Sequence, residues 1–263
     1  MRRSIITLLT DFGTRDHYVA SMKGVILGIN PQCALIDITH QVRPHDIEEG
    51  AFILANAYSH FPKGTIHVSV VDPGVGSPRK PVLLVTRNYF FLGPDNGLLT
   101  LAARGDTVKQ MIELANPTFF LPRISATFHG RDIFAPVAAH LSLGIRPGIL
   151  GPKLDSWVTL NVGDPRITGR EMVGKVLHVD AFGNLISNIR ESQILQFSQG
   201  RPFIIRAGTK STNGLKKGYR EGKKGAPIAL IGSGGFLEIS VNEGNAQKTL
   251  KIKRGDKIKV VVS

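Results

Sequence analysis

The chain has 263 residues, a formal net charge of +13 and 42% hydrophobic residues, which is typical of a folded globular protein and excludes a largely disordered one. No apolar run approaches the roughly 18 residues that a membrane helix needs, and residues 5–10 are too few for a signal peptide and lack a small-residue cleavage site. The single Cys33 excludes an internal disulfide and a multi-thiolate metal site. We therefore expect a cytoplasmic protein that does not enter a membrane.

Residues 1–143 alternate strand-like and helix-like patterns, which is typical of an α/β domain with a central, mostly parallel sheet and flanking helices. The expected strands are residues 5–10, 35–38, 68–71, 82–86 and 89–92. The expected helices are residues 17–29 (capped by Asp16 and ended by Pro31), 46–57 (with a capping box of Asp46 and Glu49), 98–103 and 133–143.

Residues 144–169 are rich in Gly and Pro and have no clear period, which indicates a domain boundary. We therefore expect an N-terminal domain over 1–150, a linker over 151–169 and a C-terminal domain over 170–263. The second domain has short strands between Gly, Asn and Asp turns and no long helical pattern, which predicts a small all-β barrel. Its expected strands are 173–179, 203–206, 228–231, 237–241, 249–252 and 257–262.

The positive charge is concentrated in this second domain. Residues 170–263 contain 17 Lys and Arg against 7 Asp and Glu, whereas the segment 1–169 carries a net charge of only +3. A basic β-barrel is one possible nucleic-acid binder. The basic cluster at residues 216–224 has one aromatic residue and two glycines, however, so it is more typical of a flexible loop than of a stacking platform. We do not expect nucleic acid to be the partner.

Two glycine-rich stretches of the first domain contain an acid, a cation and an imidazole. The apolar run 65–71 leads to Asp72 in a Pro-Gly turn, Arg79 follows in the same loop, and His129 lies in Phe-His-Gly-Arg-Asp at 128–132. Loops at the carboxyl ends of parallel strands bind ligands in α/β folds. Each residue also has an ordinary alternative: a turn cap, a solvated cation and a hydrogen-bonded core histidine. Together they predict an enzyme site.

Asp11 follows the first expected strand, where a carboxylate can bind two ribose hydroxyls or cap the next loop. Neither a G-x-G-x-x-G loop nor a Walker phosphate loop accompanies it, and Gly74-Val75-Gly76 is only a partial match. This pattern predicts a nucleoside ligand without a phosphate chain.

The second domain adds two turns with polar side chains. Residues 179–188 include Asp180 and Asn184, and the glycine-rich turn 231–236, which includes Ser233, offers backbone N–H groups to a carboxylate. A turn stabilised by its own Asp and Asn explains the first equally well, and a hairpin turn explains the second.

At these motifs the chain resembles the S-adenosyl-L-methionine (SAM) hydroxide adenosyltransferase family, which also contains fluorinases and chlorinases. The similarity extends along nearly the whole chain, and seven motifs in the same order make it specific. They are Thr-Asp-Phe-Gly at 10–13, Asp-Ile-Thr-His at 37–40, Asp-Pro-Gly-Val-Gly at 72–76, Pro-Asp-Asn-Gly-Leu at 94–98, Phe-His-Gly-Arg-Asp at 128–132, Asp-Ala-Phe-Gly-Asn at 180–184 and Gly-Ser-Gly-Gly-Phe-Leu-Glu-Ile at 232–239.

The resemblance implies a homotrimer whose substrate, SAM, lies between one subunit's N-terminal domain and its neighbour's C-terminal domain. It implies attack on C5′ by a water or hydroxide that Asp72, Arg79 and His129 hold, giving adenosine and L-methionine. A neutral thioether leaves, so neither a metal nor another cofactor is expected. Fluorinase-like members carry Tyr at the position of Asp72 and Tyr-Ser at His129-Gly130, which favours hydrolysis over halide transfer here.

By the same resemblance, Asp11 binds the ribose hydroxyls, Asp180 and Ser233 hold the amino and carboxylate groups of methionine, and Asn184 lies against the sugar or adenine. The candidates near adenine are Tyr219, Phe236 and Asn242. This chain departs from fluorinase-like members at Gly234 and Val241, where they have arginines, and at His45, where they have tryptophan. A chlorinase-like transferase and a non-catalytic nucleoside or SAM sensor are the alternative functions.

Overall fold

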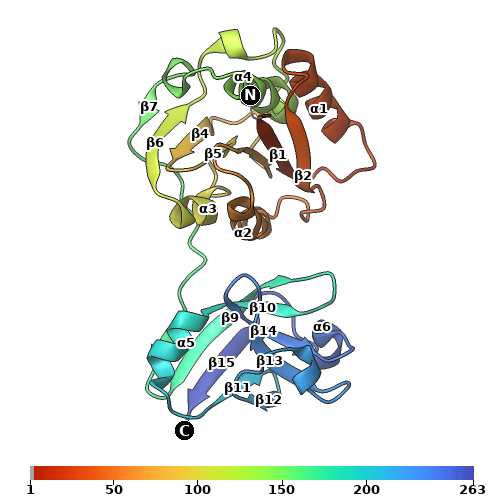
Figure 1. Ribbon diagram of the computed structural model, residues 1–263, viewed down its shortest axis with the longest axis vertical. Coiled ribbons are helices and arrows are strands. Elements are labelled where there is room, and N and C mark those ends of the chain that lie inside the picture. The colour runs from red at the N-terminus through yellow and green to blue at the C-terminus, as the bar shows by residue number, and fades with distance from the viewer. Residues whose placement is uncertain (1–2) are drawn as a thin grey trace. The chain divides into compact units, whose positions relative to one another are not determined.

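The computed structural model describes residues 3–263, and the chain divides into two compact units, Met1–Leu160 and Asn161–Ser263. Each unit contains a sheet of its own (Figure 1). The hydrophobic core of the first unit consists of two clusters of buried side chains, and that of the second unit is a single cluster. Within the described range, the longest and most apolar helices still fall short of what a bilayer crossing requires.

The first unit is built on a seven-stranded sheet in the order β2-β1-β3-β5-β4-β6-β7. Its strands are β1 (Ile5–Thr10), β2 (Ala34–Thr39), β3 (Ile66–Val70), β4 (Pro81–Thr86), β5 (Phe90–Pro94), β6 (Val108–Glu113) and β7 (Lys153–Leu154). The first four in sheet order are parallel, and the remaining pairings are antiparallel. The sheet is therefore mixed, where the sequence predicted a mostly parallel one. A short turn between β4 and β5 accounts for the difference, because so short a connection joins only antiparallel strands.

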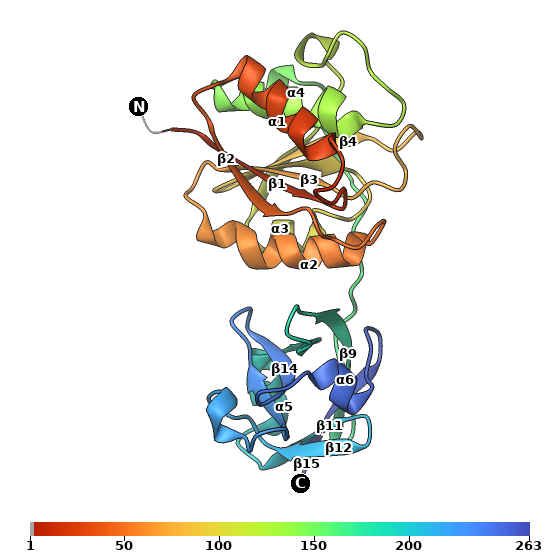
Figure 2. The same ribbon diagram turned by 90° about the vertical axis from the view of Figure 1, so that its right-hand side faces the viewer.

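Helices cover both faces of this sheet. Figure 2 shows α1 (Tyr18–Ile29) with α4 (Ala135–Ser142) on one face, and α2 (Ile47–Ala57) with α3 (Thr100–Gly105) on the other. Asp46 caps α2 as predicted, since its carboxylate accepts from the Glu49 amide at 3.0 Å. The predicted Asp16 cap is wrong, because α1 begins after His17 and has no side-chain cap.

Two parts of the first unit differ from the sequence prediction. Residues 108–113, which were not expected to be regular, form β6 between β4 and β7. The expected helix over 133–143 is divided into a π-helical turn, Gly130–Phe134, and the α-helix α4. Such π-turns are frequent at functional sites, and this one begins directly after His129.

The second unit is an eight-stranded antiparallel sheet in the order β12-β11-β15-β9-β10-β14-β13, with β8 paired to β9. The strands are β8 (Arg166–Thr168), β9 (Glu171–Val179), β10 (Leu185–Arg190), β11 (Phe203–Ala207), β12 (Lys210–Asn213), β13 (Pro227–Ile231), β14 (Phe236–Val241) and β15 (Lys257–Val262). The amide of Lys216, just after β12, donates to Ala229 O in β13 at 2.8 Å. The sheet is therefore a nearly closed barrel, the architecture that the sequence predicted.

Short helices interrupt this barrel where the sequence has no helical pattern. They are α5 (Glu191–Ser198) and α6 (Ala246–Leu250). The strand predicted over 249–252 is wrong, because Asn245 caps α6 by accepting from the Lys248 amide at 2.8 Å and the left-handed Lys251 (φ 54°) ends it. The local propensity of Thr249 and Ile252 for a strand is overridden by this cap.

Candidate active site

Asp11 and Asp72 leave the same edge of the first unit's sheet. Strands β1 and β3 are parallel neighbours, with Thr10 paired to Val70. The loops that follow their carboxyl ends therefore begin side by side. Asn96 holds the second turn, since its Nδ2 donates to Val71 O at 2.9 Å. This edge is where α/β folds place their ligands.

The structure brings Asp72, Arg79 and His129 together, although His129 is distant from the other two in the sequence. Arg79 Nε donates to Asp72 Oδ1 at 3.0 Å, and Arg79 Nη2 donates to Asp72 Oδ2. The same Nη2 contacts His129 Nδ1 at 2.7 Å. The side chains of Asp72 and Arg79 are only 5% and 9% exposed. The guanidinium thus joins the buried carboxylate to the half-buried imidazole in one cluster, called here the Asp72–Arg79–His129 cluster.

The Arg79 contact fixes where the His129 proton lies. A guanidinium has donors and no acceptor, so Nδ1 of His129 accepts and the neutral ring carries its hydrogen on Nε2. Burial, and next the positive charge of Arg79, lower the pKa of His129 below its ordinary value. Within residues 3–263, Arg79 Nη1 is buried without a hydrogen-bond partner, so one donor of the guanidinium is unused.

The loop that follows β1 is held against the segment after β2. Asp11 Oδ2 accepts from the His45 amide at 2.8 Å, and His45 has a positive φ of 68°. Asp11 Oδ1 has no partner among the described residues, so it is free to meet a ligand hydroxyl. Phe12 packs against Phe128 with 5.8 Å between ring centres, which links this loop to the residue before His129.

In the second unit, Asp180 organises its own turn. Its Oδ1 accepts from the amides of Phe182 at 2.9 Å and Asn184 at 2.8 Å, and its Oδ2 accepts from Asn184 Nδ2 at 2.9 Å. This is the turn-stabilising role that the sequence left open as an alternative. Asn184 is buried, whereas the Phe182 ring between them is 77% exposed. Ligand binding by Asp180 would add to this role.

Tyr219 and Asn242 line one open hollow of about 640 Å³ in the second unit. Tyr219 donates from its hydroxyl to Glu238 Oε1 at 2.8 Å, and burial together with Glu238 raises the pKa of Tyr219 to about 12. Asn242 Nδ2 donates to Gly222 O at 2.7 Å, so this amide stabilises the loop after Tyr219.

The remaining candidates of the second unit lie on the turn before β14 and at its start. Ser233 is exposed and makes no side-chain hydrogen bond within the described chain. Phe236 is half-buried, and the Arg190 guanidinium lies over its ring at 4.4 Å from the ring centre. The structure therefore leaves the Ser233 hydroxyl open to solvent and one face of the Phe236 ring covered.

Sequence reasoning missed two buried acids next to the candidates. Asp132 is fully buried and accepts from the Ser125 amide at 2.7 Å, which fixes the loop before His129. Glu238 is buried and accepts from the hydroxyls of Tyr219 and Ser240. For Glu238 the available signal was an acid within the apolar stretch 236–239, and for Asp132 it was the apolar run that begins directly after it, since charged residues are rarely buried without a partner.

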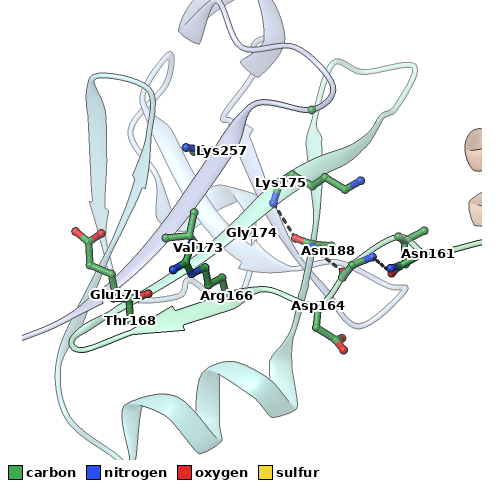
Figure 3. Close-up of a pocket in the computed structure, with 13 residues that line it drawn as sticks. Asn161, Asp164, Arg166, Thr168, Glu171, Val173, Gly174, Lys175, Asn188 and Lys257 are labelled. Carbon is green, nitrogen blue, oxygen red and sulfur yellow. Dashed lines mark hydrogen bonds between the residues drawn. The ribbon is translucent and has the colours of Figure 1, made fainter.

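A second hollow of about 750 Å³ lies against β8 and β9. Figure 3 shows Asn188 at its edge, where Oδ1 accepts from the Lys175 amide at 2.8 Å and Nδ2 donates to Gly163 O at 2.9 Å. The ammonium groups of Lys175 and Lys257 point away from each other in this view. None of the candidate residues lines the hollow, and its polar groups do not converge on a common point.

Metal-ligating side chains do not gather in the described part of the chain. Among residues 3–263, no three His, Cys, Asp or Glu side chains are placed so as to hold a metal ion. The candidate acids Asp11, Asp72 and Asp180 instead accept from guanidinium or amide donors, as described above.

Comparison with known families decides the identity. The model of the SAM hydroxide adenosyltransferase N-terminal domain matches residues 6–151, and that of the C-terminal domain matches residues 174–259. The chain belongs to the SAM hydroxide adenosyltransferase family. The two matched segments fall within the two units of the fold, so the SAM hydroxide adenosyltransferase domains correspond to the α/β unit and the barrel unit.

Similar proteins support the same family. A protein of Methanocaldococcus jannaschii named (R)-S-adenosyl-L-methionine hydrolase is 38% identical, covering 98% of this chain and 95% of its own. A protein of the same name from Thermus thermophilus is 36% identical, covering 97% and 99%. The crystal structure of an uncharacterized conserved protein from Thermotoga maritima has a TM-score of 0.91 at 38% identity, over 97% of this chain and 99% of that one. A fluorinase of Nocardia brasiliensis is only 26% identical, over 99% and 98%.

Proposed function

We propose that this chain hydrolyses SAM to adenosine and L-methionine. The observation that carries the proposal is the Asp72–Arg79–His129 cluster, at a sheet edge typical of ligand binding in α/β folds. Relatives named (R)-S-adenosyl-L-methionine hydrolase, 36% and 38% identical over nearly the full length, support it. The lower identity to a fluorinase favours water over halide as the nucleophile.

The reaction forms one bond and breaks one. The oxygen of a water attacks C5′ of the adenosyl group, the C5′–S bond breaks, and its electron pair stays on sulfur. The positively charged sulfonium becomes the neutral thioether of methionine, and the water gives up one proton as adenosine forms. Because little charge develops on the leaving group, we propose that the reaction uses no metal and no other cofactor.

The hydrogen-bond roles in the cluster divide the work between its members. His129 has only its Nε2–H left to offer, so it orients the water by donating and cannot take its proton. Asp72 is the one member with an acceptor left for the water, because Nδ1 of His129 already accepts from Arg79, and we propose that Asp72 takes the proton of the attacking water. Arg79 holds both partners in place and stabilises negative charge on the attacking oxygen, with Nη1 as its unused donor.

The proposed substrate contacts are divided between the two units. Asp11 in the first unit takes the ribose hydroxyls through its open Oδ1. The contacts proposed in the second unit are Asp180, Asn184, Ser233, Tyr219, Phe236 and Asn242. We propose a cytoplasmic homotrimer in which neighbouring copies supply the two sets of residues to one substrate.

The proposal is tested by incubating the purified protein with SAM, with and without chloride, and separating the products by chromatography. We expect adenosine and methionine in both cases, lost in Asp72→Ala and retained in the control Asp155→Ala, whose side chain is exposed. A 5′-chloro nucleoside in the presence of chloride would instead identify a halide transferase. Unchanged SAM that stays bound to the protein would overturn hydrolysis and indicate a sensor.

A further inference from the structure

Four polar side chains form a continuous chain of contacts next to the Asp11 loop. Lys23 Nζ in α1 lies 2.6 Å from Asp37 Oδ2 in β2, and Asp37 Oδ1 lies 3.1 Å from His40 Nε2. His40 Nδ1 in turn contacts Thr10 Oγ1, at the end of β1, at 2.9 Å. His40 is only 4% exposed and Thr10 is fully buried. The proposed reaction assigns none of these four side chains a role.

The surroundings fix the tautomer of His40. Burial alone would raise the pKa of Asp37, but the hydrogen bond from Lys23 and the close contact with His40 outweigh it and lower this pKa, so the carboxylate stays ionised. It lies off the ideal line of a hydrogen bond to Nε2 but close enough to keep the imidazole hydrogen on that atom. With that hydrogen on Nε2, Nδ1 accepts from the Thr10 hydroxyl. That hydroxyl oxygen accepts from the Phe12 amide at 3.2 Å.

Three hydrogen bonds connect His40 and the residues after it to the Asp11 loop. The first is from the Thr10 hydroxyl, and the second is from the Gly13 amide, which donates to His40 O at 2.7 Å. The third is from the His45 amide, which donates to Asp11 Oδ2 at 2.8 Å. A positive φ at a non-glycine residue such as His45 is strained, so the surrounding bonds must hold it in place. Together they leave Asp11 Oδ1 as the open oxygen.

We infer that His40 is a positioning residue for Asp11. Its bond to Thr10 sets the loop so that Asp11 Oδ1 meets the ribose hydroxyls of the substrate, and Asp37 with Lys23 keeps the imidazole in the tautomer that accepts this bond. The inference rests on the proposed function, in which Asp11 takes the ribose.

Two substitutions of His40 separate its two contacts. His40→Asn places an amide oxygen near the position of Nδ1, so it preserves the acceptor for Thr10 and loses the contact with Asp37. His40→Gln places an amide nitrogen near the position of Nε2, so it preserves the contact with Asp37 and loses the acceptor. Thr10→Val removes the hydroxyl without changing the side-chain shape and gives a second way to break the bond. Thermal unfolding of each variant checks that it is folded.

The readout is the preference for ribose over deoxyribose, measured as the ratio of the Kd values for 2′-deoxyadenosine and adenosine by calorimetry. One hydrogen bond to a charged group contributes roughly 1.5–3 kcal/mol, so the wild type should prefer adenosine by about 10- to 150-fold. We expect His40→Asn to keep this preference, and His40→Gln and Thr10→Val to reduce it to within about 3-fold of unity. In His40→Gln and Thr10→Val, KM for SAM should rise by the same factor by which the ribose preference falls, with kcat nearly unchanged.

Three outcomes would overturn the inference. Retention of the full ribose preference by both His40→Gln and Thr10→Val would show that the bond does not place Asp11. An equal loss of affinity for both nucleosides would show a merely structural role. The absence of any ribose preference in the wild type, or a preference that is unchanged in Asp11→Asn, would show that Asp11 does not bind the ribose. Hydrolysis itself is tested separately by the product assay.

Discussion

His67 makes the first unit sensitive to acid. It lies in β3 with no exposed surface, its Nδ1 is 2.8 Å from Thr7 Oγ1, and its ring is stacked on Phe91 at 5.1 Å. Its Nε2 is buried without a hydrogen-bond partner in the described chain. The titratable side chains that pack against the ring are Tyr58 and Tyr89. Burial lowers the pKa of His67 to about 3.

This shift predicts that the free energy of unfolding falls as the pH falls. Below the ordinary pKa of 6.5, the unfolded chain binds a proton at His67 that the folded protein does not bind until about pH 3. The free energy of unfolding therefore falls by up to about 1.4 kcal/mol for each pH unit by which the pH is lowered in this window. Between pH 7.5 and pH 5.0 the loss from this one side chain amounts to about 2 kcal/mol.

Urea unfolding followed by the fluorescence of Trp157 measures this loss. Trp157 is the only tryptophan and packs against the same core cluster as Tyr58 and Phe91, so it reports on the first unit. His67→Phe keeps an aromatic ring and removes the titration. We expect the wild type to lose about 2 kcal/mol more than this variant between the two pH values. Equal losses in the two proteins would refute the reasoning.

Three further predictions concern the cluster and its loop. Arg79→Lys keeps the charge but loses the bidentate contact with Asp72, so the rate of adenosine formation should fall by a factor on the order of 10² or more. Near wild-type turnover would contradict this prediction. Protonation of His129 breaks its contact with Arg79, and the pKa of His129 is lowered. The fall of kcat/KM at acidic pH should therefore lie below pH 6.5, and it should be absent in His129→Asn. Gly76→Ala places a Cβ on a residue with φ 78°, at 2.4 Å from Ala126 O. Urea unfolding should therefore show that the free energy of unfolding falls by roughly 1–2 kcal/mol or more. The control Gly74→Ala should not show this loss, because the atom nearest to its Cβ is 3.4 Å away.

Local signals in the sequence were sufficient for the elements that depend on nearby residues. Asp46 and Glu49 located the start of α2, and the apolar run after Thr65 located β3. The antiparallel half of the first sheet was not predictable in this way, because β6 pairs with β4 although β5 and α3 lie between them in the chain. The strand predicted at 249–252 failed for a different reason, since the deciding signal, the cap at Asn245, is local and the prediction followed the strand propensity of Thr249 and Ile252 instead.

The motifs identified the residues of the Asp72–Arg79–His129 cluster but not their hydrogen bonds. That Arg79 donates to both neighbours, and so fixes the His129 tautomer, depends on a contact between two motifs far apart in the chain. His40 lies in the Asp-Ile-Thr-His motif, and the sequence alone indicates no role for it. Its position depends on the pairing of β1 with β2, whose register shifts between Leu8–Asp37 and Leu9–Thr39. Such an irregularity re-aims the following side chain and leaves no clear mark in the sequence.

The candidate acids share a feature that bears on how this site would work: each is already held by a donor of its own unit. Arg79 holds Asp72, the His45 amide holds Asp11, and the amides of the 180–184 turn hold Asp180. A carboxylate fixed before the substrate arrives loses little conformational freedom on binding, so more of the contact energy is retained. The proposed reaction has a good leaving group and needs an oxygen placed in line with the C5′–S bond. Placement is the contribution that such a fixed set of acids can make.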